Sequence, residues 1–243
     1  MQRIVVQSVS KKFHIGETMS KSPLRFLLSL VIPQERKRLL WAVSDASFSV
    51  GAGEIVGVVG PNASGKSTLL RLIAGIYLLD SGEIETTGNI IPFIDLRSGE
   101  GRLTLEDNIR FLGAFFGMSW KTINQRLESI ISFAELEKLR HAKLYQFSAG
   151  MYYRLTFSIA LHADPDILLL DEVFEVGDEG FKKKAAEQLQ QLAQKGGSIM
   201  FVSHDLETVS RYCQRVIWLD AGKIKMVGQT ADVIARYKAT YET

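Results

Sequence analysis

Hydrophobic positions along this chain follow two different spacings. Within 105–162, apolar residues recur at helical spacing in three successive runs, which begin at Glu106, Trp120 and Met151. Elsewhere, short stretches are apolar almost throughout, as in strands that are buried on both faces of a parallel sheet. These stretches are 54–59, 166–170 and 197–203. The mixture predicts an α/β fold in which a helical segment is inserted between strands of a sheet.

Weaker patterns supply the other expected elements. Residues 3–7 alternate weakly and predict an edge strand, and 42–50 predicts a second strand that Gly51 and Gly53 turn into the stretch at 54–59. Further strands are expected at 84–86, 90–94 and 215–219, and further helices at 69–74 and 231–241.

The whole chain, 1–243, is expected to form one domain. Its 243 residues suffice for one large α/β domain, and the hydrophobic fraction of 46% allows a sizeable core. We expect 105–162 to form a helical subdomain, and 1–104 with 163–243 to form the core together with an antiparallel β subdomain.

Residues 16–40 are expected to be an inserted amphipathic segment. Ser22 and Pro23 predict a helix start, apolar residues follow at helical spacing from Leu24 to Val31, and the stretch 34–38 is strongly polar. Such a segment can contact a membrane surface or a membrane partner, or can pack on its own domain. The sequence favours neither alternative.

Composition and charge exclude several classes of protein. The net charge of +2 gives no argument for nucleic-acid binding, and the single cysteine, Cys213, excludes an internal disulfide and indicates a reducing compartment. We expect no signal peptide, and the apolar stretch 24–32 is far shorter than the ~20 residues of a membrane helix. A chain that is soluble by itself but can lie on a membrane is therefore expected.

One motif dominates the candidate chemistry. The stretch 60–68 fits G-x-x-x-x-G-K-[ST], the phosphate-binding loop called Walker A, and it lies between a predicted strand and a predicted helix. Its glycines allow a tight turn, and its backbone N–H groups and the following helix N-terminus favour an anion. Lys66 can reach the β- and γ-phosphates, and the Ser67 hydroxyl can ligate Mg²⁺. The expected ATP-binding residues of the loop are Gly60, Pro61, Asn62, Ala63, Ser64, Gly65, Lys66, Ser67 and Thr68.

Two acids follow another apolar strand. Asp171 and Glu172 come directly after four apolar residues, at the carboxyl end of a strand where ligands of open α/β sheets bind. Asp171 is placed to hold Mg²⁺, and Glu172 to polarise an attacking water. His204 ends a further strand that we expect beside the Asp171 strand, which favours a contact with the γ-phosphate.

Two more candidates lie far from these strands in the sequence. Ser148 is expected to cap the helix that starts near Gly150, which would place a hydroxyl and free N–H groups at the positive end of a helix dipole. Phe13 could stack on a nucleotide base or belong to the core; its spacing leaves both open.

Together these motifs resemble the ABC-type ATPase family over nearly the whole chain. The resemblance implies a P-loop NTPase core of the ABC ATPase type, with an antiparallel β subdomain and an inserted α-helical subdomain. It implies that Phe13 takes the place of the adenine-stacking aromatic and that His204 is the switch histidine. In the family, two such domains face each other head to tail, so Ser148 and Gly150 would complete the nucleotide site of a second copy. Asp178 keeps the family's spacing from Asp171.

The chain also departs from the general family pattern. The signature motif, usually Leu-Ser-Gly-Gly-Gln, corresponds here to residues 147–151, with Ala149 and Met151 in place of Gly and Gln. The Q-loop glutamine is missing, and its position falls near Asp95, which together with Asp178 is a weak site candidate.

These departures are similar to one branch of the family, the ATPase subunits of polysaccharide, O-antigen and teichoic-acid exporters. The residues that match this branch are Ser148, Gly150, Met151, Arg154, Leu155, Asp171, Glu172, Val173, Val176, Gly177 and Asp178. Some members of the branch carry an additional carbohydrate-binding domain at the C-terminus. Because this chain ends at Thr243, soon after the predicted helix at 231–241, we expect no such domain here.

The resemblance predicts the ATP-hydrolysing subunit of an exporter for a lipid-linked polysaccharide, which uses ATP and Mg²⁺. Such a subunit would work as a homodimer on the cytoplasmic face of the cell membrane, docked to separate transmembrane permease subunits and without nucleic acid. An ABC ATPase for a different cargo and a non-transport ABC ATPase remain as alternatives.

Overall fold

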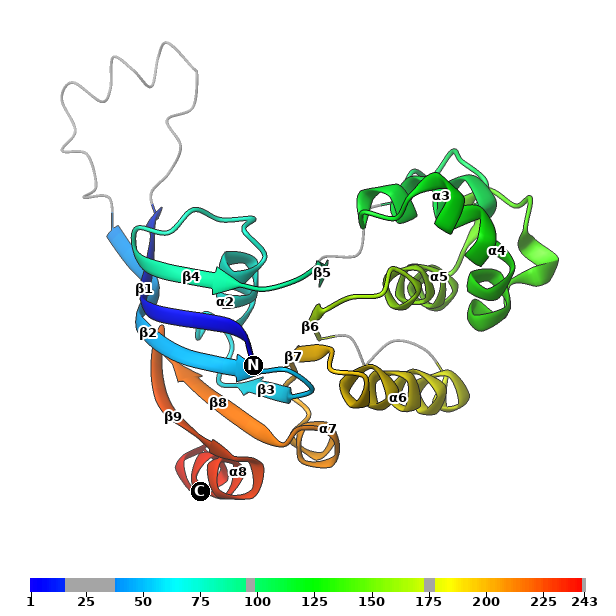
Figure 1. Cartoon of the computed structure of the whole chain (residues 1–243). Coiled ribbons are helices and arrows are strands. Elements are labelled where there is room, and N and C mark those ends of the chain that lie inside the picture. Colours follow the sequence, from blue (N-terminus) through cyan, green and yellow to red (C-terminus); the bar gives the residue numbers. More distant parts are fainter. Residues whose placement is uncertain (16–37, 95–98, 173–177, 242–243) are drawn as a thin grey trace, which may run out of the picture.

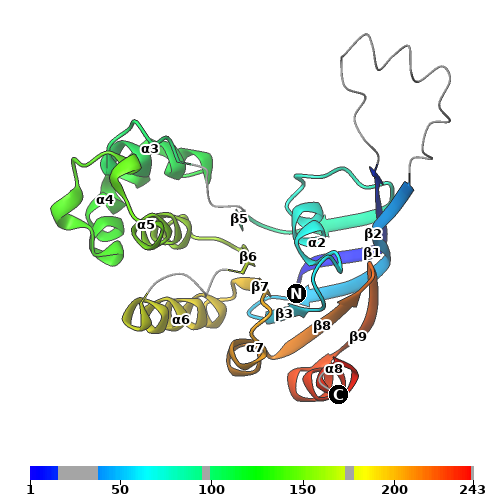
Figure 2. The same ribbon diagram turned by 180° about the vertical axis from the view of Figure 1, so that it is seen from behind.

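The computed structural model describes residues 1–15, 38–94, 99–172 and 178–241. The predicted helix within 16–40 and the candidate Asp95 lie outside these ranges. Figures 1 and 2 show two groups of strands, with helices α3, α4 and α5 together at one side of the molecule and strands β1, β2 and β4 at the other.

The smaller sheet is antiparallel and has the order β2–β1–β4. Its strands are β1 (Gln2–Ile15), β2 (Arg38–Gly51) and β4 (Ser81–Thr86). The expectation of an edge strand at 3–7 is wrong, because β1 lies between the other two strands and pairs with both. Ile4 and Val6 are buried, whereas Val5 between them is half-buried, which blurred the alternation. Since β2 begins at Arg38, the last residues of the predicted insert, 38–40, belong to this strand.

The larger sheet has the order β5–β6–β7–β3–β8–β9. Its parallel strands are β5 (Ile90–Phe93), β6 (Ile167–Asp171), β7 (Ser198–Val202), β3 (Ile55–Val59) and β8 (Arg215–Asp220). Strand β9 (Lys223–Gln229) pairs antiparallel to β8 at one edge. Every residue of β3 and β7 is buried, so their continuous apolar patterns arise because both faces of the sheet are covered.

Two hydrophobic clusters cover the two faces. Val56 and Val58 of β3 pack with the β1–β2 sheet and with α2 (Lys66–Ile73), whereas Ile55 and Val59 pack with the other helices. Those helices are α3 (Leu105–Phe115), α4 (Trp120–Ala134), α5 (Ala149–His162), α6 (Glu179–Gln194), α7 (Leu206–Tyr212) and α8 (Thr230–Tyr241). The three helices expected within 105–162 are confirmed, whereas α6, α7 and β9 were not predicted.

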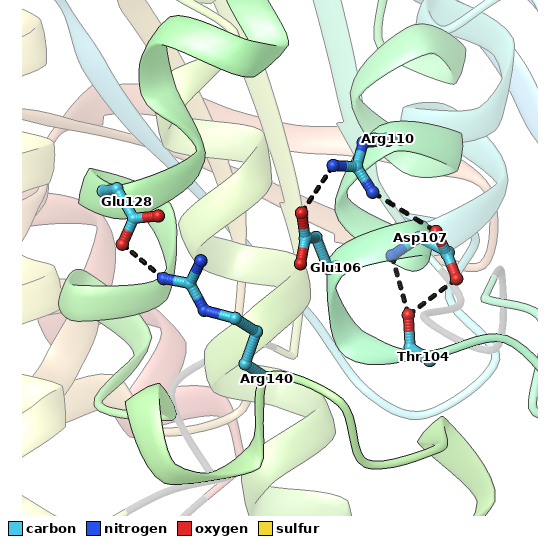
Figure 3. Close-up of polar contacts among 6 residues, drawn as sticks. All are labelled: Thr104, Glu106, Asp107, Arg110, Glu128 and Arg140. Atoms are coloured by element: carbon cyan, nitrogen blue, oxygen red, sulfur yellow. Dashed lines mark hydrogen bonds and ion pairs between the residues drawn. The ribbon is translucent and has the colours of Figure 1, made fainter.

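Side chains define the starts of the helices. Each helix from α3 to α7 has a Ser, Thr or Asp whose oxygen accepts a hydrogen bond from a backbone N–H of the first turn. In Figure 3, Thr104 accepts from the Asp107 N–H at 3.1 Å, and Arg110 pairs with Glu106 and Asp107 along the same helix. A further ion pair, between Arg140 and Glu128, connects the segment after α4 back to that helix.

The end of α5 gives a pH-dependent contribution to stability. The His162 Nδ1 atom lies 2.7 Å from the Ser158 carbonyl oxygen, and the ring packs edge-to-face on Phe133. Burial lowers the pKa of His162 below its ordinary 6.5, so folding favours the neutral ring. Its contribution to stability is therefore complete above the unfolded pKa of 6.5 and is lost as the pH falls toward the lower folded value.

We expect His162→Gln, which keeps an N–H but does not titrate, to become less sensitive to acid than the parent protein. Urea unfolding at several pH values between 7.5 and 5.5 measures this. The free-energy difference between parent and variant should shift in favour of the variant as the pH falls. A difference that is constant across this range would contradict the assignment.

Candidate functional site

The loop 60–68 connects β3 directly to α2, as the sequence predicts. Helix α2 begins at Lys66, inside the motif, and its N-cap Gly65 is in the left-handed conformation with φ 105°. Unlike α3 to α7, α2 has no side-chain cap, so the N–H groups of its first turn are not blocked by a capping oxygen. An uncapped helix start preceded by a tight loop is suited to bind an anion.

Backbone from two other strands packs against this loop. A Cβ atom added to Gly60 would lie 1.9 Å from the Leu219 carbonyl oxygen, and one added to Gly65 would lie 2.0 Å from the Ala42 carbonyl oxygen. In addition, the Gly222 N–H donates to the Ser64 carbonyl oxygen at 2.9 Å. Thus the glycines are required by the protein's own packing as well as by phosphate. The sequence signals a close backbone approach at these glycines, but not which strands make it.

Lys66 is the buried cation of the loop. Its Nζ atom donates to the carbonyl oxygens of Gly60 at 2.8 Å and Pro61 at 3.0 Å, and the residue is only 6% exposed. Burial lowers the pKa of Lys66, while the nearby charges of Glu172 and Asp171 raise it in part. Carbonyl oxygens only partly replace water around an ammonium group, so phosphate oxygens would suit this position better.

Asp171 lies at the end of β6, close to the start of α2. Burial raises the pKa of Asp171, against the lowering effects of a Ser67 hydrogen bond and the charges of Arg71 and Lys66. Its Oδ1 atom is buried and has no hydrogen-bond partner among the described residues. A carboxylate oxygen without a partner, beside a serine hydroxyl, fits the hard-oxygen ligand set that Mg²⁺ prefers.

Arg71 was missed by the sequence analysis. It lies four residues after Ser67 on α2, which places the two on one helix face, and its charge lowers the pKa of Asp171. The helical spacing was the available signal, but Arg71 was read only as part of an amphipathic helix.

Glu172 and His204 lie close together at the carboxyl ends of strands β6 and β7. The strands β6 and β7 are paired, with Asp171 opposite Val202, as expected for the strand before His204. The Glu172 Oε1 atom lies 3.9 Å from His204 Nδ1, and both side chains are more than half exposed. Glu172 has φ 54°, a strained value for a residue with a side chain, and its N–H donates to the Val202 carbonyl oxygen at 2.9 Å. The carboxylate is therefore fixed at its base and open to solvent at its tip.

The structure places two predicted residues in other parts of the molecule. Phe13 lies on β1 of the antiparallel sheet, half-buried and edge-to-face with Tyr77, and Lys11 lies over its ring. Its stacking on a base therefore stays a prediction. Ser148 caps α5 as expected: its Oγ atom accepts from the Met151 N–H at 3.2 Å, which leaves the hydroxyl hydrogen free to donate elsewhere.

Asp178 caps α6. Its Oδ1 atom accepts from the Phe181 N–H at 2.9 Å, and its Oδ2 atom pairs with Arg154 at 2.9 Å. The hydrogen bond from Phe181, and secondarily the charge of Arg154, lower the pKa of Asp178. Asp178 thus links two helices and does not lie free in solvent.

A buried loop lysine, an uncapped helix start and two acids at the carboxyl edge of a parallel sheet define a P-loop nucleotide-binding domain. The family model described as "ABC transporter" matches residues 43–175, which is more than half of the chain. The chain belongs to the ABC transporter family.

Curated relatives match nearly the whole length of this chain. It is 37% identical over 236 residues to the O-antigen export system ATP-binding protein RfbB of Myxococcus xanthus, covering 96% of this chain and 54% of that protein. It is 36% identical to the teichoic acids export ATP-binding protein TagH of Bacillus cereus, covering 96% of this chain and 42% of that protein. The chain therefore spans about half the length of these two relatives.

Solved structures support the fold class. A dimeric, post-hydrolysis ATP-binding cassette bound to ADP and Pi superposes with a TM-score of 0.76 at 22% identity, covering 93% of this chain and 98% of that chain. The P-loop core with an antiparallel β subdomain and an inserted helical subdomain, predicted from the sequence, is thereby confirmed. Among the described residues, no helix combines the length and the apolar character that a membrane crossing requires.

The packing of the loop can be tested with two matched glycines. Gly65 and Gly196 both have left-handed φ, 105° and 93°, but only Gly65 has backbone within 3 Å of an added Cβ. Gly196→Ala should cost about 1–2 kcal/mol, the penalty for the backbone conformation alone. Gly65→Ala should cost clearly more and abolish binding of a fluorescent ATP analogue. Urea unfolding measures both changes, and equal losses in the two variants would contradict the role of the Ala42 contact.

Proposed function

We propose that this chain is the ATP-hydrolysing subunit of an ABC transporter that exports a lipid-linked polysaccharide, such as an O-antigen, capsule or teichoic acid. The observation that carries the proposal is the meeting of Lys66, Asp171, Glu172 and His204 at one edge of the parallel sheet. The likeness to O-antigen and teichoic-acid export proteins over 96% of the chain supports the cargo class.

The loop 60–68 binds the nucleotide phosphates in this proposal. The N–H groups at the start of α2 and the Lys66 ammonium neutralise the phosphate charge. Ser67 and the unpaired Oδ1 of Asp171 would hold Mg²⁺, which when bound stabilises charge on the β- and γ-phosphates.

Glu172 acts as general base or orients the attacking water. It follows Asp171, the proposed magnesium ligand, and its carboxylate is open to solvent beside His204. His204 contacts the γ-phosphate. Glu172 thus acts on the water and His204 on the phosphate, both at the carboxyl end of the parallel sheet.

A second copy of the chain completes each site. Helices α2 and α5 lie on opposite sides of strands β5 and β6 in both views, which supports a site that needs α5 of a second copy (Figures 1 and 2). In a head-to-tail pair, Ser148 and Gly150 of each copy would contact the nucleotide of the other, and ATP would join the two. Hydrolysis would then weaken the pair, a two-state switch that can drive transport.

The pair would dock to separate permease subunits on the cytoplasmic face of the cell membrane. The described helices supply no membrane crossing, and the relatives named above are ATP-binding proteins of export systems. An ABC ATPase for another cargo, or one acting on DNA or ribosomes, remains the alternative.

The ATPase assignment is tested by Glu172→Gln. Loss of the base should lower turnover by about 10²- to 10⁴-fold, while ATP binding persists and the nucleotide-bound dimer accumulates. Phosphate release and light scattering of the eluting protein measure these two effects. Hydrolysis at the normal rate in this variant would show that Glu172 has been misassigned.

The transport assignment is tested by purification from membranes. We expect a polytopic membrane protein to co-purify with the chain from detergent extracts, and genes of glycan synthesis to neighbour that partner's gene. Co-purification of ribosomes or DNA, with no membrane protein retained, would favour the non-transport alternative.

A further inference from the structure

Helix α5 is tied to the rest of the chain by two side chains in its second turn. The Tyr152 hydroxyl oxygen accepts a hydrogen bond from the Gly99 N–H at 2.7 Å. Two residues on, the Arg154 guanidinium pairs with Glu135 through Nη1 and with Asp178 through Nη2, both at 2.9 Å. Neither contact is required to form α5, whose start is already capped by Ser148.

Gly99 and Asp178, which contact these two residues, each lie shortly after a strand of the larger sheet. Strands β5 and β6 are neighbours, and the chain continues from their carboxyl ends toward Gly99 and Asp178 respectively. Asp178 is only six residues beyond Glu172. The second turn of α5 therefore contacts residues that follow β5 and β6 in the sequence, and β6 is the strand that ends at the acids.

Arg154 is the centre of a three-helix junction. Its guanidinium lies 5.7 Å from the centre of the Phe181 ring on α6, and Glu135, just after α4, also pairs with Lys184 of α6 at 3.3 Å. The two planar N–H arms of arginine contact two carboxylates at once, which a single ammonium could not do with the same geometry. The junction connects α5 to both α4 and α6, in addition to the buried core side chains of α5.

Ser148 lies six residues before Arg154, a distance of about 9 Å along the helix axis. A small rotation of α5 about the Arg154 junction would therefore displace the Ser148 hydroxyl. We propose that Arg154, assisted by Tyr152, is a positioning residue. It holds the Ser148 end of α5 at a fixed position relative to the carboxyl ends of β5 and β6, so that Ser148 and Gly150 contact a partner copy's nucleotide. This inference rests on the head-to-tail dimer of the proposed function.

The test uses the Glu172→Gln protein and measures the ATP concentration at which half of it is dimeric. Arg154→Met keeps an aliphatic stem over Phe181 but removes both ion pairs. It should raise that concentration about tenfold, as the loss of two half-exposed ion pairs would give. Tyr152→Phe should raise it less, because one hydrogen bond is lost. Binding of a fluorescent ATP analogue to the monomer should stay within about twofold, because the loop 60–68 is untouched.

Arg126→Met is the matched control. Arg126 of α4 contacts the His162 carbonyl oxygen and Asp164, at the other end of α5, so its loss should lower the melting temperature comparably without changing dimerisation. Equal effects of Arg126→Met and Arg154→Met on dimerisation would overturn the positioning role. So would a matching loss of monomer nucleotide binding in Arg154→Met. If the Glu172→Gln protein itself does not dimerise with ATP, the proposed function fails and the inference falls with it.

Discussion

The parallel pairing of β6, β7 and β3 is the constraint on which the site depends. Because Asp171 pairs with Val202 and Val58 also pairs with Val202, the carboxyl ends of the three strands lie side by side. The loop that follows β3, the acids at the end of β6 and the histidine after β7 are therefore brought to the same end of the sheet. A slip of one residue in β3 would exchange the faces of its side chains and bring Val56 or Val58 to the place of Gly57, where an added Cβ would lie 2.8 Å from Val209.

A nucleotide would stabilise the charged forms of Lys66 and Asp171, which their burial disfavours. Burial lowers the pKa of Lys66 and raises the pKa of Asp171, so each charged form is disfavoured by its surroundings. Their mutual attraction offsets only part of this cost. Phosphate near Lys66 and a cation near Asp171 would favour both charges. These opposite shifts support the proposed binding of ligands that carry opposite charges together, as magnesium nucleotides do.

Local patterns in the sequence predicted those parts of the structure that depend on neighbours in the chain. The strand–loop–helix at 54–74, the cap at Ser148 and the acids at the end of β6 follow from residue type and spacing. The central place of β1 could not be predicted, because the two strands beside it come from 38–51 and 81–86, and only the fold brings them together. Similarly, the glycines of the loop signalled close packing, but their contacts, Ala42 and Leu219, are brought there by the fold.

The two halves of the proposed composite site are held by different kinds of contact. The loop 60–68 packs against backbone carbonyls, and contacts of that kind cannot shift without moving whole strands. Helix α5 is held mainly by core side chains such as Leu155 and Phe157, which are fully buried. The two ion pairs of Arg154 add about 0.2–1 kcal/mol each, because their acids are about half exposed. In the proposed head-to-tail pair, the loss of these ion pairs would therefore alter the fit of Ser148 to the partner copy's nucleotide while the packing of both halves persists.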